Sequence, residues 1–214
     1  KQGATRREKI LTATDKVGKL AGIPVVVNAV NAVNRSKSGR KLLDSMLGVH
    51  PDAPVPEYHS KTARKRLKDR VGADGSTAQA SESTTGKVAL FTTCYCNRNH
   101  PVVNEDLVAV FEHNGIAVTL ASKEVCCGMP KLELGDLESV QKAKEQNIPA
   151  LVKLVDEGWD IVTPIPSCTL MFKQELPLMY PDDPDVIKVR DAMYDPFEYL
   201  MLRHKDGVLK TDFK

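Results

Sequence analysis

Two adjacent cysteines, Cys126 and Cys127, are followed by Gly128 in the second half of the chain. A single cysteine is most often a small buried hydrophobic residue, but two neighbouring thiols before a glycine are hard to explain by packing alone. The other cysteines are Cys94, Cys96 and Cys168. Because thiolates bind iron-sulfur clusters and zinc, the set predicts a metal or redox centre.

The segments that carry these thiols alternate between strand and helix patterns. Short apolar runs of the kind that form buried strands are separated by stretches with apolar residues at helical spacing. Such an alternation predicts an α/β fold, with a parallel sheet and helices on both of its faces. The predicted strands cover residues 88–91, 116–120 and 160–163.

Each predicted strand is followed by at least one cysteine. Cys94 follows the first strand, Cys126 and Cys127 follow the second, and Cys168 follows the third. Because the carboxyl ends of parallel strands lie at one edge of the sheet, these four thiols are expected to meet there. Gly128 gives the backbone after the pair a conformation closed to other residues and leaves room for an inorganic core. A helix that begins at Cys168 would favour its thiolate, which is the form that binds metal.

The region before the first predicted strand differs in character from the rest. Residues 1–60 are predicted to form a helical arm with one apolar face, because apolar residues recur there at helical spacing. Residues 61–86 begin with a basic run and continue with small and polar residues, which predicts a basic, flexible linker. The α/β domain is then expected over residues 87–214. The predicted helices of the arm cover residues 10–21, 25–33 and 38–47.

The charge of the chain is divided unevenly. Residues 1–70 hold 16 basic and 6 acidic residues, whereas residues 71–214 hold 14 and 22, which gives net charges of +10 and −8. A basic arm suggests a negatively charged partner, either a protein surface or anionic lipid, and a merely solvated basic face is the alternative. No aromatic residues are interleaved with the basic run, so a nucleic-acid partner is not expected.

The chain contains no pattern typical of a secreted or membrane-spanning protein. Its most apolar run, residues 20–33, is interrupted by Asn and Pro and is shorter than the roughly 20 apolar residues that span a bilayer. Five cysteines are an odd number for a secreted disulfide framework. A cytoplasmic location is therefore expected, with contact to the inner face of the cell membrane through residues 1–60. The start at Lys1, without Met, suggests a piece of a longer protein.

Three segments around the cysteines resemble the cysteine-rich CCG domain, a family that includes subunits of heterodisulfide reductase and iron-sulfur subunits of oxidases and dehydrogenases. The segments are 93–95, 126–136 and 166–177, within a resemblance that covers residues 87–200. The 31 residues between Cys94 and Cys126 also fit the family spacing. Parts of the arm resemble one of the dehydrogenase subunits as well.

The resemblance implies an iron-sulfur cofactor, of the 4Fe-4S type in cubane or non-cubane form. It implies Cys94, Cys126, Cys127 and Cys168 as ligands, with Gly128 beside them. Zinc is the alternative metal for the same four thiolates.

Two positions depart from the family pattern. The pattern ends in C-x-x-C, but Met171 stands where the second of these cysteines would be. A thioether is a much poorer ligand for iron than a thiolate, so Met171 is expected in the core. Cys96 lies where the family has no ligand. It either replaces the missing thiolate or takes no part, and the second interpretation is favoured.

The resemblance implies an electron-transfer module of a respiratory-type oxidoreductase. Such a module relays electrons between a flavin dehydrogenase subunit or a ferredoxin-like part and quinone or a thiol substrate. Related subunits carry a ferredoxin-like part and a second CCG domain that these 214 residues lack, so a fragment or subunit of an enzyme is expected. Two other functions stay open, namely a structural zinc or docking module and a thiol-disulfide oxidoreductase that uses Cys126 and Cys127.

Overall fold

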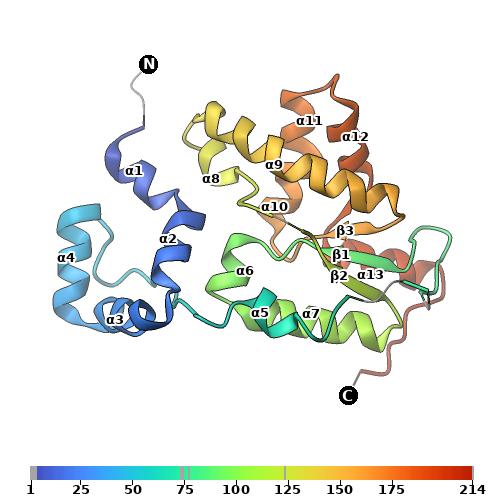
Figure 1. The fold of residues 1–214 in the computed structure, drawn as a ribbon, viewed down its shortest axis with the longest axis horizontal. Helices are drawn as coiled ribbons and strands as arrows, with labels where there is room; N and C mark the ends of the chain where they lie inside the picture. Colours follow the sequence, from blue (N-terminus) through green and yellow to red (C-terminus); the bar gives the residue numbers. More distant parts are fainter. Residues whose placement is uncertain (1–3, 73–74, 77, 123, 214) are drawn as a thin grey trace.

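The computed structural model describes residues 4–72, 75–76, 78–122 and 124–213. Its centre is a parallel sheet with helices on both faces, so the predicted α/β fold is confirmed (Figure 1). The strand order is β2-β1-β3-β4, and all pairs of neighbouring strands are parallel. The strands are β1 (Lys87–Leu90), β2 (Ala117–Leu120), β3 (Asp160–Val162) and β4 (Met193–Tyr194). β4 was not predicted, because a strand of two residues carries no periodic signal.

Strand β1 lies in the middle of the sheet and separates two apolar cores. Val88 and Leu90 point to one face, where they pack with helices α5, α7 and α13. Ala89 and Phe91 point to the other face, toward the helices between β2 and β4. All four side chains are fully buried. This is the alternation of side chains that a strand covered on both faces requires.

Helices connect consecutive strands as right-twisted parallel sheets require. Between β1 and β2 lie α6 (Cys94–Arg98) and α7 (Pro101–His113). Between β2 and β3 lie α8 (Met129–Leu132) and α9 (Leu137–Asp156). Between β3 and β4 lie α10 (Pro166–Leu170), the π-helical turn η1 (Met171–Glu175), α11 (Leu176–Met179) and α12 (Pro184–Asp191), and α13 (Pro196–Lys205) follows β4.

The arm consists of four helices rather than the predicted three. They are α1 (Arg6–Leu11), α2 (Thr14–Ala21), α3 (Pro24–Arg35) and α4 (Lys37–Leu47). The helix predicted over residues 10–21 is broken at Thr12 and Ala13, where the Thr12 hydroxyl donates a hydrogen bond to the Glu8 carbonyl oxygen. Such a side-chain bond competes with continuation of the helix. The arm ends at Gly48, whose positive φ of 59° suits a helix C-cap.

Helix α5 (Ala63–Leu67) lies in the range predicted as a linker. Leu67 is only 1% exposed and packs with Val108 and Phe111 in the core on the α7 side of the sheet. Arg66 and Arg70 pair with glutamates of α7. The basic residues of this stretch therefore bind the domain itself. Residues 73, 74 and 77 of the predicted linker lie outside the described residues.

In the part of the chain that the structure describes, no single helix is long and apolar enough to cross a membrane. Helices α2 and α3 reach the required length and composition only as a pair, and they meet at a bend of 107°.

Candidate functional site

The thiols that follow the three predicted strands meet at the carboxyl edge of the sheet. The Sγ atoms of Cys94 and Cys126 are 3.9 Å apart. The Cys127 thiol donates hydrogen bonds to the sulfurs of Cys126 and Cys168. Cys127 and Cys168 are buried, whereas Cys94 and Cys126 are half-buried. Three loops far apart in the sequence thus bring four thiols into one continuous array.

The array is arranged to hold negative charge on Cys126. Hydrogen bonds from Cys127 and Cys94 lower the pKa of the Cys126 thiol to about 2, with further help from Thr14 and the Gly128 backbone N–H. The same bonds, together with burial, raise the pKa values of Cys94 and Cys127. A bound metal would displace the remaining protons, because only thiolates are ligands.

Met171 belongs to the core, as its thioether chemistry predicted. It is fully buried in the same apolar cluster as Cys127 and Cys168. It begins the π-helical turn that follows α10. Cys168 itself lies in the first turn of α10, after Pro166. The chain therefore keeps one thiol of the family's C-x-x-C pair at this edge and fills the position of the other with an apolar side chain.

Cys96 lies closer to the other thiols than its position outside the family pattern suggested. It is fully buried in α6, and burial raises the pKa of its thiol to about 11. The charge on Cys168 raises this pKa further, which places the two sulfurs within electrostatic range. The Cys96 backbone N–H donates to the Thr93 hydroxyl at 3.2 Å. Whether Cys96 binds a metal stays a prediction, with no participation favoured.

Two unusual backbone conformations occur beside the thiols. Gly128 has a φ of 102°, which L side chains rarely adopt, as the sequence predicted. A Cβ added there would lie in ordinary contact with Ala143 and Met171, so the backbone angle rather than a lack of space requires glycine. Thr93, next to Cys94, has a φ of 60° and is the one non-glycine residue with a positive φ among those described. Such strain is typical of functional loops.

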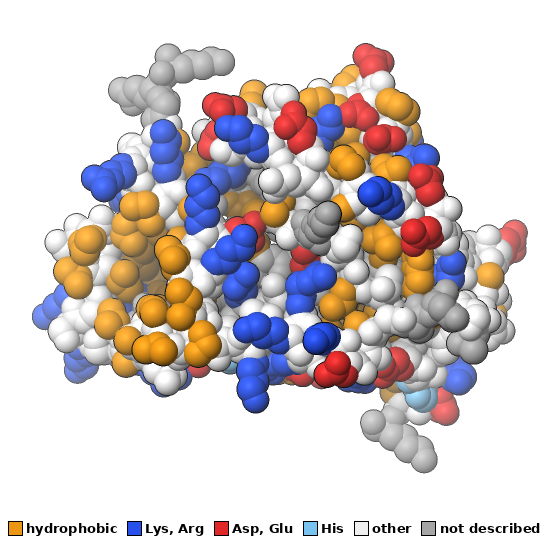
Figure 2. All heavy atoms as spheres, viewed as in Figure 1, with side chains coloured by type: hydrophobic (Ala, Val, Ile, Leu, Met, Phe, Trp, Pro, Cys, Tyr) orange, Lys and Arg blue, Asp and Glu red, His pale blue; other side chains and the backbone are white. Residues whose placement is uncertain are grey.

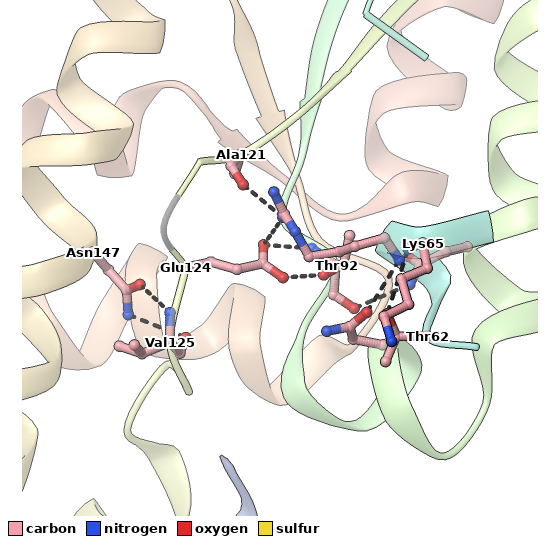
Figure 3. Close-up of polar contacts among 10 residues, drawn as sticks. Thr62, Lys65, Thr92, Ala121, Glu124, Val125 and Asn147 are labelled. Atoms are coloured by element: carbon pink, nitrogen blue, oxygen red, sulfur yellow. Dashed lines mark hydrogen bonds and ion pairs between the residues drawn. The ribbon is translucent and has the colours of Figure 1, made fainter. Parts of the chain in front are cut away.

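Glu124 joins the loops that carry Cys94 and Cys126. Its carboxylate accepts hydrogen bonds from the backbone N–H and the hydroxyl of Thr92, the first at 2.8 Å (Figure 3). Arg64 of α5 lies 3.5 Å from the same carboxylate and donates to the Ala121 carbonyl oxygen at 2.7 Å. Burial raises the pKa of Glu124 to about 7, and Arg64 and Thr92 act against this rise.

Asn147 holds the same loop from the opposite side. This buried side chain of α9 accepts a hydrogen bond from the Val125 backbone N–H at 3.0 Å and donates to the Cys126 carbonyl oxygen at 3.3 Å (Figure 3). The loop of Cys126 is therefore fixed between α9 and the Glu124 contacts. Such fixed supports orient ligands, because a rigid loop loses little entropy on binding.

The arm also reaches the thiol array. The Thr14 hydroxyl donates to the Cys126 sulfur at 3.5 Å, and the Asp15 carboxylate accepts a hydrogen bond from the Cys126 backbone N–H. Burial raises the pKa of Asp15, while its bond to Cys126 lowers it. Helix α2 packs on α6 through the close approach of Gly18 and Arg98. The first turn of α2 thus forms one wall of the site.

The residues present suit a cluster of iron and sulfide better than one isolated ion. Within the described part of the chain, no three His, Cys, Asp or Glu side chains are arranged to hold a single metal ion. The donor set is nevertheless all thiol, delivered by rigid loops, with hydroxyl and N–H donors aimed at sulfur. These are the features by which proteins bind iron-sulfur clusters and adjust their potential.

Comparison with known proteins agrees with this description. The family model of the cysteine-rich domain, CCG, matches residues 88–173. This segment contains the four thiols of the array and the three longer strands. Residues 88–173 are therefore a cysteine-rich CCG domain, as the sequence resemblance predicted.

Two relatives extend the similarity. An anaerobic glycerol-3-phosphate dehydrogenase subunit of Escherichia coli (strain K12) is 28% identical over 172 residues, which are 80% of this chain and 41% of the relative. Lactate utilization protein A of Bacillus cytotoxicus is 31% identical over 119 residues, 54% of this chain and 48% of the relative. The chain thus spans less than half of either relative. No solved structure matches it. The similarity supports an oxidoreductase-associated iron-sulfur module.

Several residues of the site were not predicted from the sequence. They come from the arm, from the range predicted as a linker, and from α9 and the loops after β1 and β2, and each lies at least two residues from a cysteine. Glu124 alone had a local signal, since a charged residue directly before a buried loop needs a partner. The residues in question are Thr14, Asp15, Arg64, Thr92, Glu124 and Asn147.

Proposed function

We propose that this chain is an electron-transfer module whose CCG domain holds an iron-sulfur cluster of the 4Fe-4S type. Cys94, Cys126, Cys127 and Cys168 would be its ligands. The observation that carries the proposal is the continuous array of four thiols at the carboxyl edge of the sheet. When bound, the cluster would accept and release single electrons. The chain's own residues would exclude water and fix the ligand loops.

The partners follow from the class of oxidoreductase. Electrons would pass between a flavin dehydrogenase subunit or ferredoxin-like part and quinone or a thiol substrate. The name of one relative, a dehydrogenase subunit, supports a dehydrogenase partner for this chain. The half-buried positions of Cys94 and Cys126 support transfer from this side, because two ligands lie near the surface.

Analysis of protein prepared without oxygen tests the proposal. We expect visible absorbance, with iron and labile sulfide in equal amounts, and an EPR signal on oxidation or reduction. Colourless protein with one zinc per chain would instead establish the structural zinc module. Metal-free protein with a reducible bond between Cys126 and Cys127 would establish the thiol-disulfide oxidoreductase.

Replacement of Thr14 by valine is expected to lower the reduction potential of the cluster. The Thr14 hydroxyl donates to the Cys126 sulfur, and this bond stabilises the more negative, reduced state. Loss of about 1 kcal/mol of such differential stabilisation corresponds to on the order of 40 mV for one electron. A potentiometric titration followed by EPR measures the change. Thr12→Val is the control, because the Thr12 hydroxyl bonds to the Glu8 carbonyl oxygen; equal shifts in both variants would contradict this role of Thr14.

The arm would dock on a membrane surface at the inner face of the cytoplasmic membrane. Figure 2 shows a broad apolar area on the arm with basic side chains around it. Val25, Leu20 and Met46 are 87%, 66% and 69% exposed. Apolar and basic side chains together favour anionic lipid. We expect the wild-type chain to float with vesicles of anionic lipid, and Val25→Asp to weaken this flotation; flotation that is equal for both would indicate that the area binds a protein partner instead.

A further inference from the structure

A cleft of about 1220 Å³ lies between the arm and the CCG domain. One wall is formed by residues 9–19 of α1 and α2, and the other by α8 and the start of α9. Cys126 and Gly128 lie between the two walls. Ligand pockets in proteins are typically about 300–1,000 Å³, so the cleft is large enough for a small molecule with bound water.

Lysines dominate the charged residues of the cleft. Lys9, Lys16 and Lys19 come from the arm, whereas Lys131 and Lys142 come from the domain. Basic side chains border this hollow between the arm and α8–α9 in Figure 2. The two walls therefore present the same sign of charge to each other, which is unfavourable unless an anion lies between them.

The acidic residues of the cleft are largely engaged elsewhere. Asp15 accepts the Cys126 N–H, Asp136 accepts the Ser139 N–H as the cap of α9, and Glu138 pairs with Lys142. Across the ranges that the structure describes, no acidic side chain lies within ion-pair distance of Lys9, Lys16 or Lys19. Lys9 and Lys19 act on Asp136 and Asp15 only through longer-range attraction.

We propose that this cleft binds a small organic anion, a carboxylate or a phosphate ester, next to Cys126. The arm lysines would neutralise the anion, and the loop at Gly128 would form the floor. The position beside Cys126 makes the cleft an entrance for a small substrate or effector of the proposed redox site. The inference rests on that function for its purpose, whereas the binding itself depends only on the packing of the arm on the domain.

Calorimetric titration with inorganic phosphate and with malonate tests the cleft, at constant ionic strength in chloride. We expect one saturable site in the wild-type chain and about tenfold weaker binding in the double variant Lys16→Gln, Lys19→Gln, because each lost charge removes part of the attraction. The control is Lys37→Gln, Lys41→Gln, which removes the same charge from exposed positions on α4 of the same arm. This control is expected to bind as the wild-type chain does.

Three results would overturn the proposal. They are the absence of saturable binding of both probes, an unchanged affinity in the Lys16, Lys19 variant, and an equal loss in the control. Binding of a hexaglutamate peptide at least tenfold tighter than both probes would also overturn it and assign the cleft to an acidic protein segment. Titration of both iron-loaded and iron-free protein keeps the two ideas apart, since binding without iron would support the cleft even if the cluster proposal failed.

Discussion

The Cys168→Ala variant is expected to purify with less than about a tenth of the iron and labile sulfide of the wild-type chain. Cys168 provides the one thiol that follows β3, and its sulfur accepts a hydrogen bond from Cys127. Without it the array would lose one of its three loops. The other thiols would then lack a ligand on the side of α10. Iron and sulfide analysis of protein prepared without oxygen, with the visible spectrum, measures the effect.

The matched control is Cys96→Ala, which removes an equally small side chain from an equally buried position. If Cys96 takes no part, this variant keeps its iron and sulfide and its EPR spectrum. Loss of iron in Cys96→Ala to the level of Cys168→Ala would make Cys96 the replacement for the thiolate that Met171 displaces. Full retention of iron in Cys168→Ala would contradict the proposed ligand set. Circular dichroism of both variants separates loss of iron from loss of folding.

The Glu124→Ala variant is expected to lower the free energy of unfolding by roughly 2–4 kcal/mol. The change leaves the Thr92 N–H and the Arg64 guanidinium without their carboxylate partner next to the buried edge of the sheet. The penalty stays below that of a fully buried pair, because the Arg64 side chain is 31% exposed. Urea unfolding of the iron-free chain measures it. The loops of Cys94 and Cys126 would also separate more easily, so less iron should be bound.

A surface pair provides the comparison for Glu124. Glu112 and Arg70 form an ion pair with 41% exposure on each side, so Glu112→Gln is expected to cost less than about 1 kcal/mol and to leave iron binding unchanged. Glu124→Gln keeps an acceptor for the Thr92 N–H and is expected to lie between the two. Equal stability of the Glu124→Ala and Glu112→Gln variants would show that the contacts of Glu124 do not hold the loops together.

The two lysine-lined walls of the cleft bear on how the arm contributes to function. The division into residues 1–60, 61–86 and 87–214 remains a prediction, but contacts cross both of its boundaries. Thr14 and Asp15 touch Cys126, and Arg64 touches Glu124. Deletion of the arm would therefore change the thiol site as well as any docking surface. Single substitutions within the arm are the sharper experiments for this reason.

Local patterns in the sequence determined most of the architecture. The alternation of apolar runs predicted β1, β2 and β3 within one or two residues, because a strand covered on both faces must be apolar throughout. The position of each cysteine after a strand then followed from the parallel topology. The conformation of Gly128 was predicted from its residue type. The two-residue strand β4 and the break between α1 and α2 were beyond such patterns, because each depends on one or two residues.

The sequence by itself therefore determined the fold class, the edge at which the thiols meet, and the burial of Met171. Only the tertiary structure decided which side chains support that edge. Thr14 lies 112 residues from Cys126, and Arg64 lies 60 residues from Glu124. No local periodicity relates residues at such separations, since their contact depends on how the arm and α5 pack against the finished sheet. The same packing creates the cleft of lysines beside Cys126, which composition alone registered only as a basic arm.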